Sequence, residues 1–390
     1  MKRNRRCSFK KMQVRIILEH MEENNMKNIC KKKLVIIVCT CLIILGGVIY
    51  FMGNKNKVKD MPLTDGVYVV PTMNDEVKSD SAWCATFQLV WNDLKNEVVK
   101  QDIVFSPQLT MAENLNKEDF TEDMISDEYY FKIYGLKTKA LKEKIESGIK
   151  EKFNQTSDIL GDFDWSDDEL DDSNNPDYNR YFFYTMLYRE FEYKTKFKEL
   201  NKDNFGKYEN IRYFGIGNDS NKKVRDNISI LFYNSNDDFA IKLKTKSDDE
   251  VIFYKNPKGS TFNEMYENMM KEKKNYKDGT YFGESDKFKA PYIDFNVKKE
   301  YNELANKAFK TADGKDSYIA KAIQTINFSL DEKGGKVKSE AAIDWKNISA
   351  VEDEEREFYL DDTFVIFLKE KSKDKPYFAA KIDDIRKYQN

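Results

Sequence analysis

Hydrophobic and polar residues repeat with two different periods along residues 82–390. In four stretches apolar side chains recur every three to four positions, the spacing that places them on one face of a helix. Elsewhere they alternate with polar residues or form short runs between turn residues, which is typical of strands. The helices are expected at about 82–100, 137–153, 261–274 and 299–309. The strands are expected at about 102–107, 181–191, 211–216, 228–234, 238–244, 250–255, 290–297, 317–330, 363–368 and 376–382.

The order of these elements indicates the fold class. Helices come first, strands dominate later, and the two last strands form an antiparallel pair across a charged turn. Helices and strands do not alternate as they do in a repeating βαβ chain. We therefore expect an α+β domain with mixed sheets and several helices.

The stretch INFSLDEKGGKVKSEAAIDW, residues 326–345, has two interpretations. Gly334 and Gly335 supply the backbone freedom that a tight hairpin turn needs. The residues after the turn alternate, so that a strand built from them has one small or apolar face. That face consists of Gly335, Val337, Ser339, Ala341, Ile343 and Trp345. The segment is therefore either the second strand of a permanent hairpin or a loop that can become a strand.

The amino-terminal residues predict a membrane anchor. Residues 1–33 carry eleven basic and three acidic side chains, a net charge of +8, so residues 34–390 sum to −11. Residues 34–52 carry no charge, and a helix of that length spans about 28 Å, enough to cross a bilayer core. The basic flank keeps the amino end in the cytoplasm. The expected order is a basic cytoplasmic segment (1–33), a transmembrane anchor (34–52), an extracytoplasmic linker (53–81) and an extracellular domain (82–390).

Two alternatives stay open for this segment. The apolar run is also compatible with a cleaved signal peptide, although its only small-residue site, Gly46-Gly47, lies inside the run. Met26 would itself make a conventional start, in which case residues 1–25 are an upstream extension.

Composition excludes several kinds of chemistry from the exported part. The single histidine, His20, precedes the anchor, which removes histidine-based catalysis and most zinc or copper sites. Cys84 is the only cysteine there, so no internal disulfide is expected, and its apolar surroundings favour a buried thiol over a reactive one. The negative charge argues against a nucleic-acid partner. We expect no enzyme activity, no catalytic residue and no metal or other cofactor.

Two patterns are weak candidates for a ligand site. Gly215-Ile216-Gly217 matches part of a phosphate-binding loop but lacks the third glycine and the following helix, so a turn is the better interpretation. The run DFDWSDDELDD, residues 162–172, is dense in carboxylates but lacks the glycine and the final glutamate of a calcium-binding EF-hand loop. We interpret it as a solvated acidic loop, with a calcium site as the alternative.

The carboxyl-terminal residues FYLDDTFVIFLKEKSKDKPYFAAKI, 358–382, resemble the serpin family. The family's closing pattern has a phenylalanine, an aspartate, an aromatic-rich strand, a turn and a second strand. Thr363 stands where proline is usual. The matching residues are Phe358, Asp361, Phe364, Phe367, Phe378 and Ile382.

Upstream segments extend the resemblance to about residues 82–390. SYIAKAIQTINFSLDEKGG, 317–335, is similar to the strand before the serpin reactive loop, and Gln324 stands where the family has a histidine. VFSP (104–107) and TMLYREFEYKTKF (185–197) are weaker matches. The chain between Pro107 and Thr185 is shorter than in serpins, so it resembles a divergent, shortened, bacterial-type member.

The resemblance implies a hinge and a reactive loop. In inhibitory serpins the loop after a Glu-x-Gly hinge is cut by a protease and then inserts into a sheet as a strand. By this resemblance the hinge residues are Glu332, Gly334, Gly335, Val337, Ser339 and Ala341. The reactive bond falls within 348–353, a region that includes Ile348, Ser349, Ala350, Val351 and Glu352.

Two functions are compatible with this pattern. We expect a non-inhibitory binding or structural module with 336–346 as a built-in strand, because Lys338 and Glu340 interrupt the small residues that inhibitory loops carry there. The alternative is a suicide-substrate inhibitor of serine or cysteine proteases. The expected partners are an extracellular protease or another surface protein, and the membrane through residues 34–52.

Overall fold

The structure is a computed structural model, and it describes residues 62–165, 180–217, 220, 222–335 and 356–389. The expected anchor, 34–52, and the basic segment before it lie outside these residues. In the described part no helix is long and apolar enough to cross a membrane. The described compact unit begins at Pro62. Residues 62–81, which we expected to be a linker, therefore belong to the domain, and Val70 and Met73 are buried in its core.

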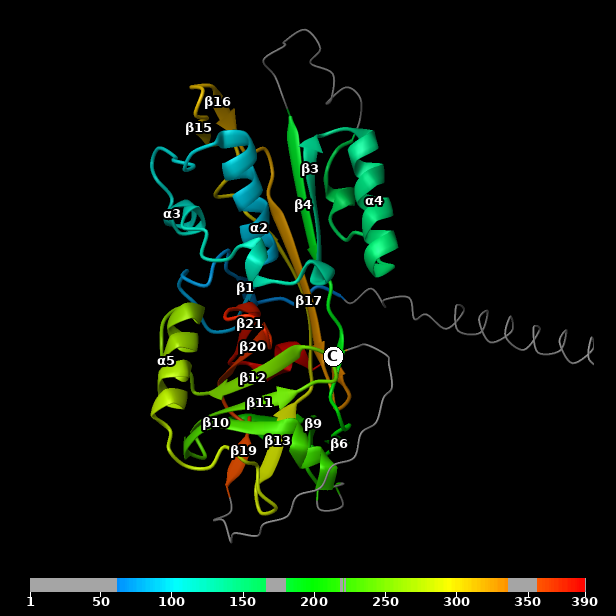
Figure 1. Ribbon diagram of the computed structural model, residues 1–390, viewed down its shortest axis with the longest axis vertical. Coiled ribbons are helices and arrows are strands. Elements are labelled where there is room, and N and C mark those ends of the chain that lie inside the picture. The colour runs from blue at the N-terminus through cyan, green and yellow to red at the C-terminus, as the bar shows by residue number, and fades with distance from the viewer. Residues whose placement is uncertain (1–61, 166–179, 218–219, 221, 336–355, 390) are drawn as a thin grey trace, which may run out of the picture. The chain divides into compact units, whose positions relative to one another are not determined.

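A seven-stranded sheet holds much of the core (Figure 1). In β12 (Asp249–Lys255) every residue is buried, and β20 (Phe364–Glu370) beside it has one half-buried residue. A strand that is covered on both faces needs apolar side chains at odd and even positions, which explains the near-continuous apolar runs in these segments. The strand order is β1 (Tyr68–Val69), β2 (Ser81–Cys84), β21 (Pro376–Ile382), β20, β12, β11 (Asp238–Lys244) and β10 (Ile228–Ser235).

Helix α5 (Phe262–Asn275) packs on this sheet. Its buried face carries Met265 and Met269, and the ring of Tyr266 lies 5.2 Å from that of Phe367 in β20. The Thr261 side chain accepts a hydrogen bond from the backbone N–H of Glu264, which satisfies a free donor of the first turn. The helix that periodicity predicts at 261–274 is thus confirmed.

Further strands form a second sheet and several pairs. The four-stranded sheet has the order β19 (Glu357–Tyr359), β13 (Lys287–Pro291), β9 (Tyr213–Gly215) and β6 (Lys198–Glu199). The pairs are β3 (Tyr130–Leu136) with β4 (Tyr181–Leu187), β14 (Ile293–Glu300) with β17 (Ile323–Leu330), β15 (Ala308–Lys310) with β16 (Asp316–Tyr318), β7 (Asp203–Phe205) with β8 (Tyr208–Ile211), and β18 (Gly334–Gly335) with β5 (Phe191–Glu192). The expected α+β class with mixed sheets is confirmed, and the described residues contain few helices.

Helices cover both faces of the β3–β4 pair (Figure 1). Helix α4 (Lys139–Phe153), where periodicity predicts a helix, packs its buried Leu141, Ile145 and Ile149 against Phe182 and Tyr184 of β4. Helix α2 (Thr86–Asp93) lies on the other side and joins α3 (Thr110–Asn116) in a separate apolar cluster.

The helix expected at 82–100 is wrong at its beginning. Residues 81–84 form strand β2, in which Trp83 lies opposite Ala379 of β21. The apolar spacing that joins Trp83 to Phe87 is misleading, because the two side chains belong to different apolar clusters. Residues 94–99 continue α2 as a π-helical turn that ends at Lys100, whose backbone is left-handed.

Two other expected elements are also wrong. Residues 102–107 form no strand, because the Asn116 side chain accepts from Ile103 N (3.2 Å) and donates to Ile103 O (2.9 Å) in place of a strand partner. No helix occupies 299–309, because β14 continues through Glu300 and the bond from Tyr301 N to Ala322 O extends its ladder with β17. A turn and β15 follow.

Candidate functional site

The predicted hinge begins with a turn after β17. The Asp331 carboxylate accepts hydrogen bonds from the backbone N–H groups of Lys333 (2.7 Å) and Gly334 (3.1 Å). Gly334 has a φ of 135°, which residues with a side chain rarely adopt, and a Cβ atom there would lie 2.3 Å from Phe191 O. Only glycine fits this position without a shift of the backbone.

The chain then pairs with β5 rather than with β17. Gly334 lies opposite Glu192, and Gly335 lies opposite Phe191, in an antiparallel register. Tyr193 N donates to Lys333 O at 2.9 Å. The hairpin interpretation placed the second strand against 326–330, and the described part of that strand does not lie there.

Glu332 holds the hinge to two neighbouring segments. Its carboxylate accepts from the Tyr292 hydroxyl at 2.8 Å and lies 3.0 Å from Lys196 Nζ, and its backbone oxygen accepts from Phe197 N. Burial raises the pKa of this carboxyl, but the hydrogen bonds from Lys196 and Tyr292 outweigh it and lower the pKa to about 2. Glu332 is therefore ionised over the physiological range.

The edge on which β18 lies continues along β4. In a strand, the backbone N–H and C=O groups of successive residues point to opposite edges. Tyr188 N donates to Tyr129 O, next to β3, so the backbone groups of even-numbered residues point to the edge that pairs with β3. Tyr193 N donates to Lys333 O, so the backbone groups of odd-numbered residues point to the other edge. The odd-numbered residues of β4 therefore direct their backbone groups to the edge that β18 occupies. Among the described residues no strand pairs with that edge of β4.

The two faces of β4 differ in the same alternating way. Phe182, Tyr184 and Met186 pack under α4. The odd-numbered side chains lie on the opposite face, where Phe183 stacks on Tyr134 with ring centroids 5.4 Å apart. Any strand added in register would place one set of its side chains on each face.

The segment 336–355 is held separately at its carboxyl end. Arg356 donates two hydrogen bonds to the Asp286 carboxylate, from Nε (2.9 Å) and Nη2 (2.8 Å), and the Asp286 side chain is fully buried. The next residues form β19, which runs parallel to β13. Both ends of the segment are thus bound to different sheets.

Not all predicted site residues can be placed. Glu332, Gly334 and Gly335 lie together at the β5 edge. Val337, Ser339, Ala341 and the reactive-bond region, Ile348, Ser349, Ala350, Val351 and Glu352, lie outside the described residues, as does the expected strand 336–346. Lys196, Tyr292, Arg356 and Asp286 were missed, because a lone lysine, tyrosine or ion pair far apart in sequence carries no local signal.

Gln324, which stands where the family has a histidine, is buried and fully hydrogen-bonded at its side chain. Its side-chain nitrogen donates to Cys84 O (3.1 Å) and Thr86 Oγ1 (2.9 Å), and its oxygen accepts from the Tyr301 hydroxyl (2.8 Å). It therefore joins β17 to the start of α2. Among the described residues, no group forms a hydrogen bond with the buried hydroxyl of Thr185 in β4.

One weak candidate for ligand chemistry has a structural explanation, and most of the other lies outside the described residues. Gly215 pairs with Lys289 inside a sheet and opens no phosphate loop. Of the acidic run, only residues 162–165 are described, and the Asp162 carboxylate lies 2.7 Å from Lys298 Nζ. Burial raises the pKa of the Cys84 thiol, which makes it unreactive. In the described part of the chain no three potential metal ligands gather.

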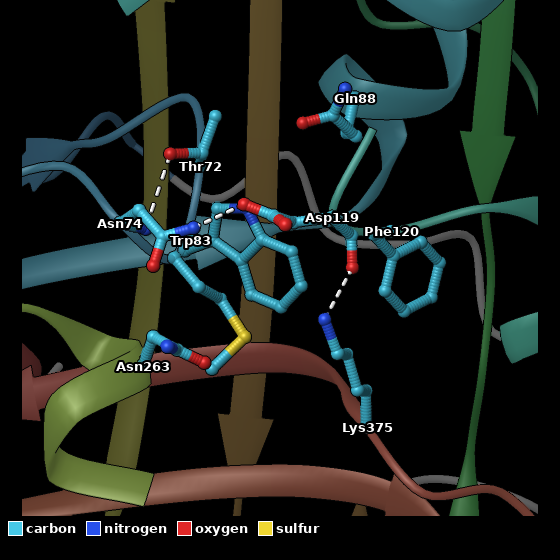
Figure 2. Close-up of a pocket in the computed structure, with 9 residues that line it drawn as sticks. Thr72, Asn74, Trp83, Gln88, Asp119, Phe120, Asn263 and Lys375 are labelled. Carbon is cyan, nitrogen blue, oxygen red and sulfur yellow. Dashed lines mark hydrogen bonds between the residues drawn. The ribbon is translucent and has the colours of Figure 1, made fainter. Parts of the chain in front are cut away.

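A small pocket lies between the amino-terminal residues and the seven-stranded sheet. Figure 2 shows Trp83 and Phe120 with polar groups around them, and Asn74 hydrogen-bonds to Asp119. Its free space of about 10 Å³ suits a single water molecule rather than an organic ligand. The hinge, and not this pocket, is therefore the candidate functional site.

Comparisons with known proteins bear on the fold. No protein-family model and no curated protein matches the chain. The chain is similar to the solved structure of the thermophilic serpin Tengpin in its native state (13% identity, 80% of this chain and 90% of that chain, TM-score 0.46). It is also similar to Serpin48 of the insect Tenebrio molitor (12%, 78% and 92%, 0.42) and to human thyroxine-binding globulin complexed with thyroxine (10%, 75% and 94%, 0.38). These solved structures are serpins, and at these identities the likeness concerns the fold alone.

Proposed function

We propose that the chain works by strand addition at the hinge, and that it is a suicide-substrate inhibitor of extracellular serine or cysteine proteases. The observation that carries this proposal is the register of β18 on β5. Gly334 opposite Glu192 and Gly335 opposite Phe191 start an antiparallel ladder on an edge that extends along β4. Residues after Gly335 are the natural continuation of that ladder.

The length of the edge matches the alternating segment. In this register the residue opposite Leu187 is Ser339, and the residue opposite Tyr181, where β4 begins, is Trp345. Odd positions of the added strand would share a face with odd positions of β4. Val337, Ser339, Ala341, Ile343 and Trp345 would thus join the face that carries Phe183, while the charged residues would take the other face.

Chain length limits this addition while the loop is intact. Ten residues of strand are about 33 Å long. The chain from Trp345 back to Arg356 has eleven steps and reaches at most about 40 Å when fully extended. About 33 Å of that reach is needed for the chain to run back along the added strand to the hinge. Arg356 is bound to Asp286, and the strand that follows it is paired with β13. A complete strand from 336 to 345 would leave only about 7 Å of reach to span the distance between the hinge and Arg356, and a cut between Trp345 and Arg356 would remove this restraint.

A cut in that interval has the chemistry of inhibition. The protease nucleophile attacks the carbonyl carbon of the scissile bond, the new amine leaves with the carboxyl-terminal piece, and the acyl group stays on the strand side. If the strand is added before water reaches the acyl bond, the protease is carried along the edge and its active site is distorted. The reactive-bond region 348–353 lies within this interval.

A second candidate function is the non-inhibitory module with a built-in strand. It is favoured by the pairing of Gly334 and Gly335 with β5 in the intact chain, since part of the strand is then already present. Because little reach remains for the return to Arg356, we expect such a permanent strand to cover mainly the first part of 336–346. Loop cleavage would then give no complex with the protease.

We also propose that the domain lies outside the cell, held by residues 34–52 as a single-pass anchor. The support is the charge-free run behind a segment of net charge +8. Protease added to intact cells should remove the domain, and protection of the domain would contradict this topology.

The inhibitor proposal is tested with the detergent-solubilised full chain. It is incubated with trypsin-, elastase- and papain-like proteases, and the products are separated by denaturing electrophoresis. We expect a stable covalent complex with at least one protease and a cut between residues 345 and 356. A cut chain that melts at a higher temperature without any complex would support the non-inhibitory module. A cut chain with an unchanged melting temperature would contradict strand addition itself.

A further inference from the structure

The segment that connects β4 to β5 is bound to the seven-stranded sheet by one ion pair. Arg189 lies between the two strands, and its Nε donates to Asp249 Oδ2 at 2.7 Å. Asp249 is the first residue of β12 and its side chain is fully buried. The pair therefore connects the β5 edge to a different sheet.

Arg189 has two contacts that fix the orientation of its side chain. Its guanidinium carbon lies 3.7 Å from the centre of the Tyr129 ring, a distance at which a cation is attracted to the ring face. Tyr129 is itself fully buried and directly precedes β3. Its backbone oxygen accepts a hydrogen bond from Tyr188 N, which extends the pairing of β3 with β4. The arginine is thus held between β3 and β12.

Asp249 in turn depends on Arg189 for charge balance. Its carboxylate accepts hydrogen bonds from the Tyr377 hydroxyl (2.7 Å) and the Ser247 hydroxyl (2.8 Å), both neutral groups. Among the described residues Arg189 is the only cation in salt-bridge contact with it. Because an unpaired buried carboxylate is strongly destabilising, the arginine cannot leave without a large cost.

We propose that Arg189 is a positioning residue for the hinge: its pair with Asp249 holds the β4–β5 junction so that Phe191, Glu192 and Tyr193 present their backbone groups to β18. Three residues after β4 have no strand pairing of their own besides the bond of Tyr188. The backbone of Glu192 and Tyr193 is bound to Lys246 and Thr245, and the side chain of Arg189 adds a restraint on the residues just before them. This inference deepens the proposed function but concerns only the pairing already present between β5 and β18.

The test is a set of four variants compared by hydrogen exchange and thermal unfolding. Arg189→Met removes the charge, Asp249→Asn removes its partner, the double variant Arg189→Met/Asp249→Asn removes both, and Arg189→Lys keeps the charge without the planar group. Exchange is followed at the amides of Tyr193 and Phe197, which bond to Lys333 and Glu332. Amides at the beginning of β11, at the end of the strand away from Thr245, which pairs with Tyr193, serve as the internal reference.

Arg189→Met should lower the melting temperature and reduce protection at the hinge amides about tenfold or more, while β11 changes less. The double variant should recover most of the melting temperature, since no charge is left buried alone, but not the hinge protection. Arg189→Lys should recover both in part. If the double variant restores hinge protection to the wild-type level, or if Arg189→Met leaves it unchanged, the pair only balances charge and the inference is wrong. Failure to trap a protease would contradict the proposed function and not this inference, because the measured amides belong to the intact chain.

Discussion

Lys255 and Asp361 form an ion pair between two sheets, with Lys255 Nζ 2.8 Å from Asp361 Oδ1. Only 3% of the Lys255 side chain is exposed, and Lys289 of the four-stranded sheet lies 3.6 Å from the other oxygen of the same carboxylate. Asp361 is the aspartate of the closing pattern that the sequence shares with serpins. Its physical role is to neutralise two lysines that come from β12 and β13.

Asp361→Asn should therefore destabilise the domain. The variant keeps the size of the side chain but leaves both lysines without this anion, and Lys255 then has only Asp237 (3.0 Å) as a charged partner. We expect a loss of about 1–3 kcal/mol in the free energy of unfolding, measured by denaturant titration. Asp362→Asn, a change at the exposed neighbouring position, is the control and should cost less than about 0.5 kcal/mol. Equal losses in the two variants would contradict this role.

Glu332 predicts a specific acid sensitivity. Its folded-state pKa of about 2 lies below the ordinary value of 4.5, so its ionised form stabilises the fold above pH 4.5. That contribution, at most about 3 kcal/mol, is lost progressively as the pH falls from 4.5 towards 2. Unfolding free energies of the wild type and Glu332→Gln should differ near pH 6 and converge near pH 2. Glu284→Gln removes an exposed partner of Lys222 and should show no comparable difference.

Gly334→Ala tests the close approach of β18 to β5. The methyl group of an alanine here would lie 2.3 Å from Phe191 O, and the alanine would have to adopt a φ of 135°. The pairing between β18 and β5 must therefore open. We expect faster exchange of the Tyr193 amide and a lower melting temperature. Gly314→Ala, at a left-handed turn with no atom within 4 Å, carries the strain of backbone conformation alone and serves as the comparison. Similar effects at the two glycines would show that the contact with Phe191 is unimportant.

Periodicity predicted the elements whose burial is decided locally. Helices α4 and α5 have one apolar face each, and the last two strands are apolar at both parities, so their patterns match their surroundings. The prediction of a helix at residues 81–84 was wrong because the strand there depends on pairing with β21, which is almost three hundred residues away in sequence. The helix predicted at 299–309 was wrong because Tyr301 and Leu304 reach the core from a turn. Two buried side chains three residues apart in a turn have the same sequence spacing as on a helix.

The hinge was predictable only in part for a related reason. Gly334 carries a local signal, since a backbone that requires positive φ selects glycine. Its partner strand does not, because Phe191 and Glu192 are ordinary strand residues and nothing in their sequence names Gly334 and Gly335 as neighbours. The ion pairs at Glu332 and Arg356 join segments that are distant in sequence, and only the fold brings them together.

The register of β18 also makes the loop testable at single residues. Continued from β5 towards β4, it places Val337 opposite Arg189, on the apolar side of the added strand, and Lys338 on the charged side. In the inserted form Val337→Glu would then bury a second carboxylate beside Arg189, whose charge already balances that of Asp249, and this costs several kcal/mol. Lys338→Glu exchanges one charge for another on the opposite face. In an inhibitor, Val337→Glu should fold normally and be cut by the protease, but release it without a stable complex, and the cut chain should gain no heat stability. Lys338→Glu should behave as the wild type.

If 336–346 were instead a permanent strand, Val337→Glu would lower the melting temperature before any protease is added. Equal behaviour of the two variants in both measurements would show that this stretch never extends the pairing of β18 with β5.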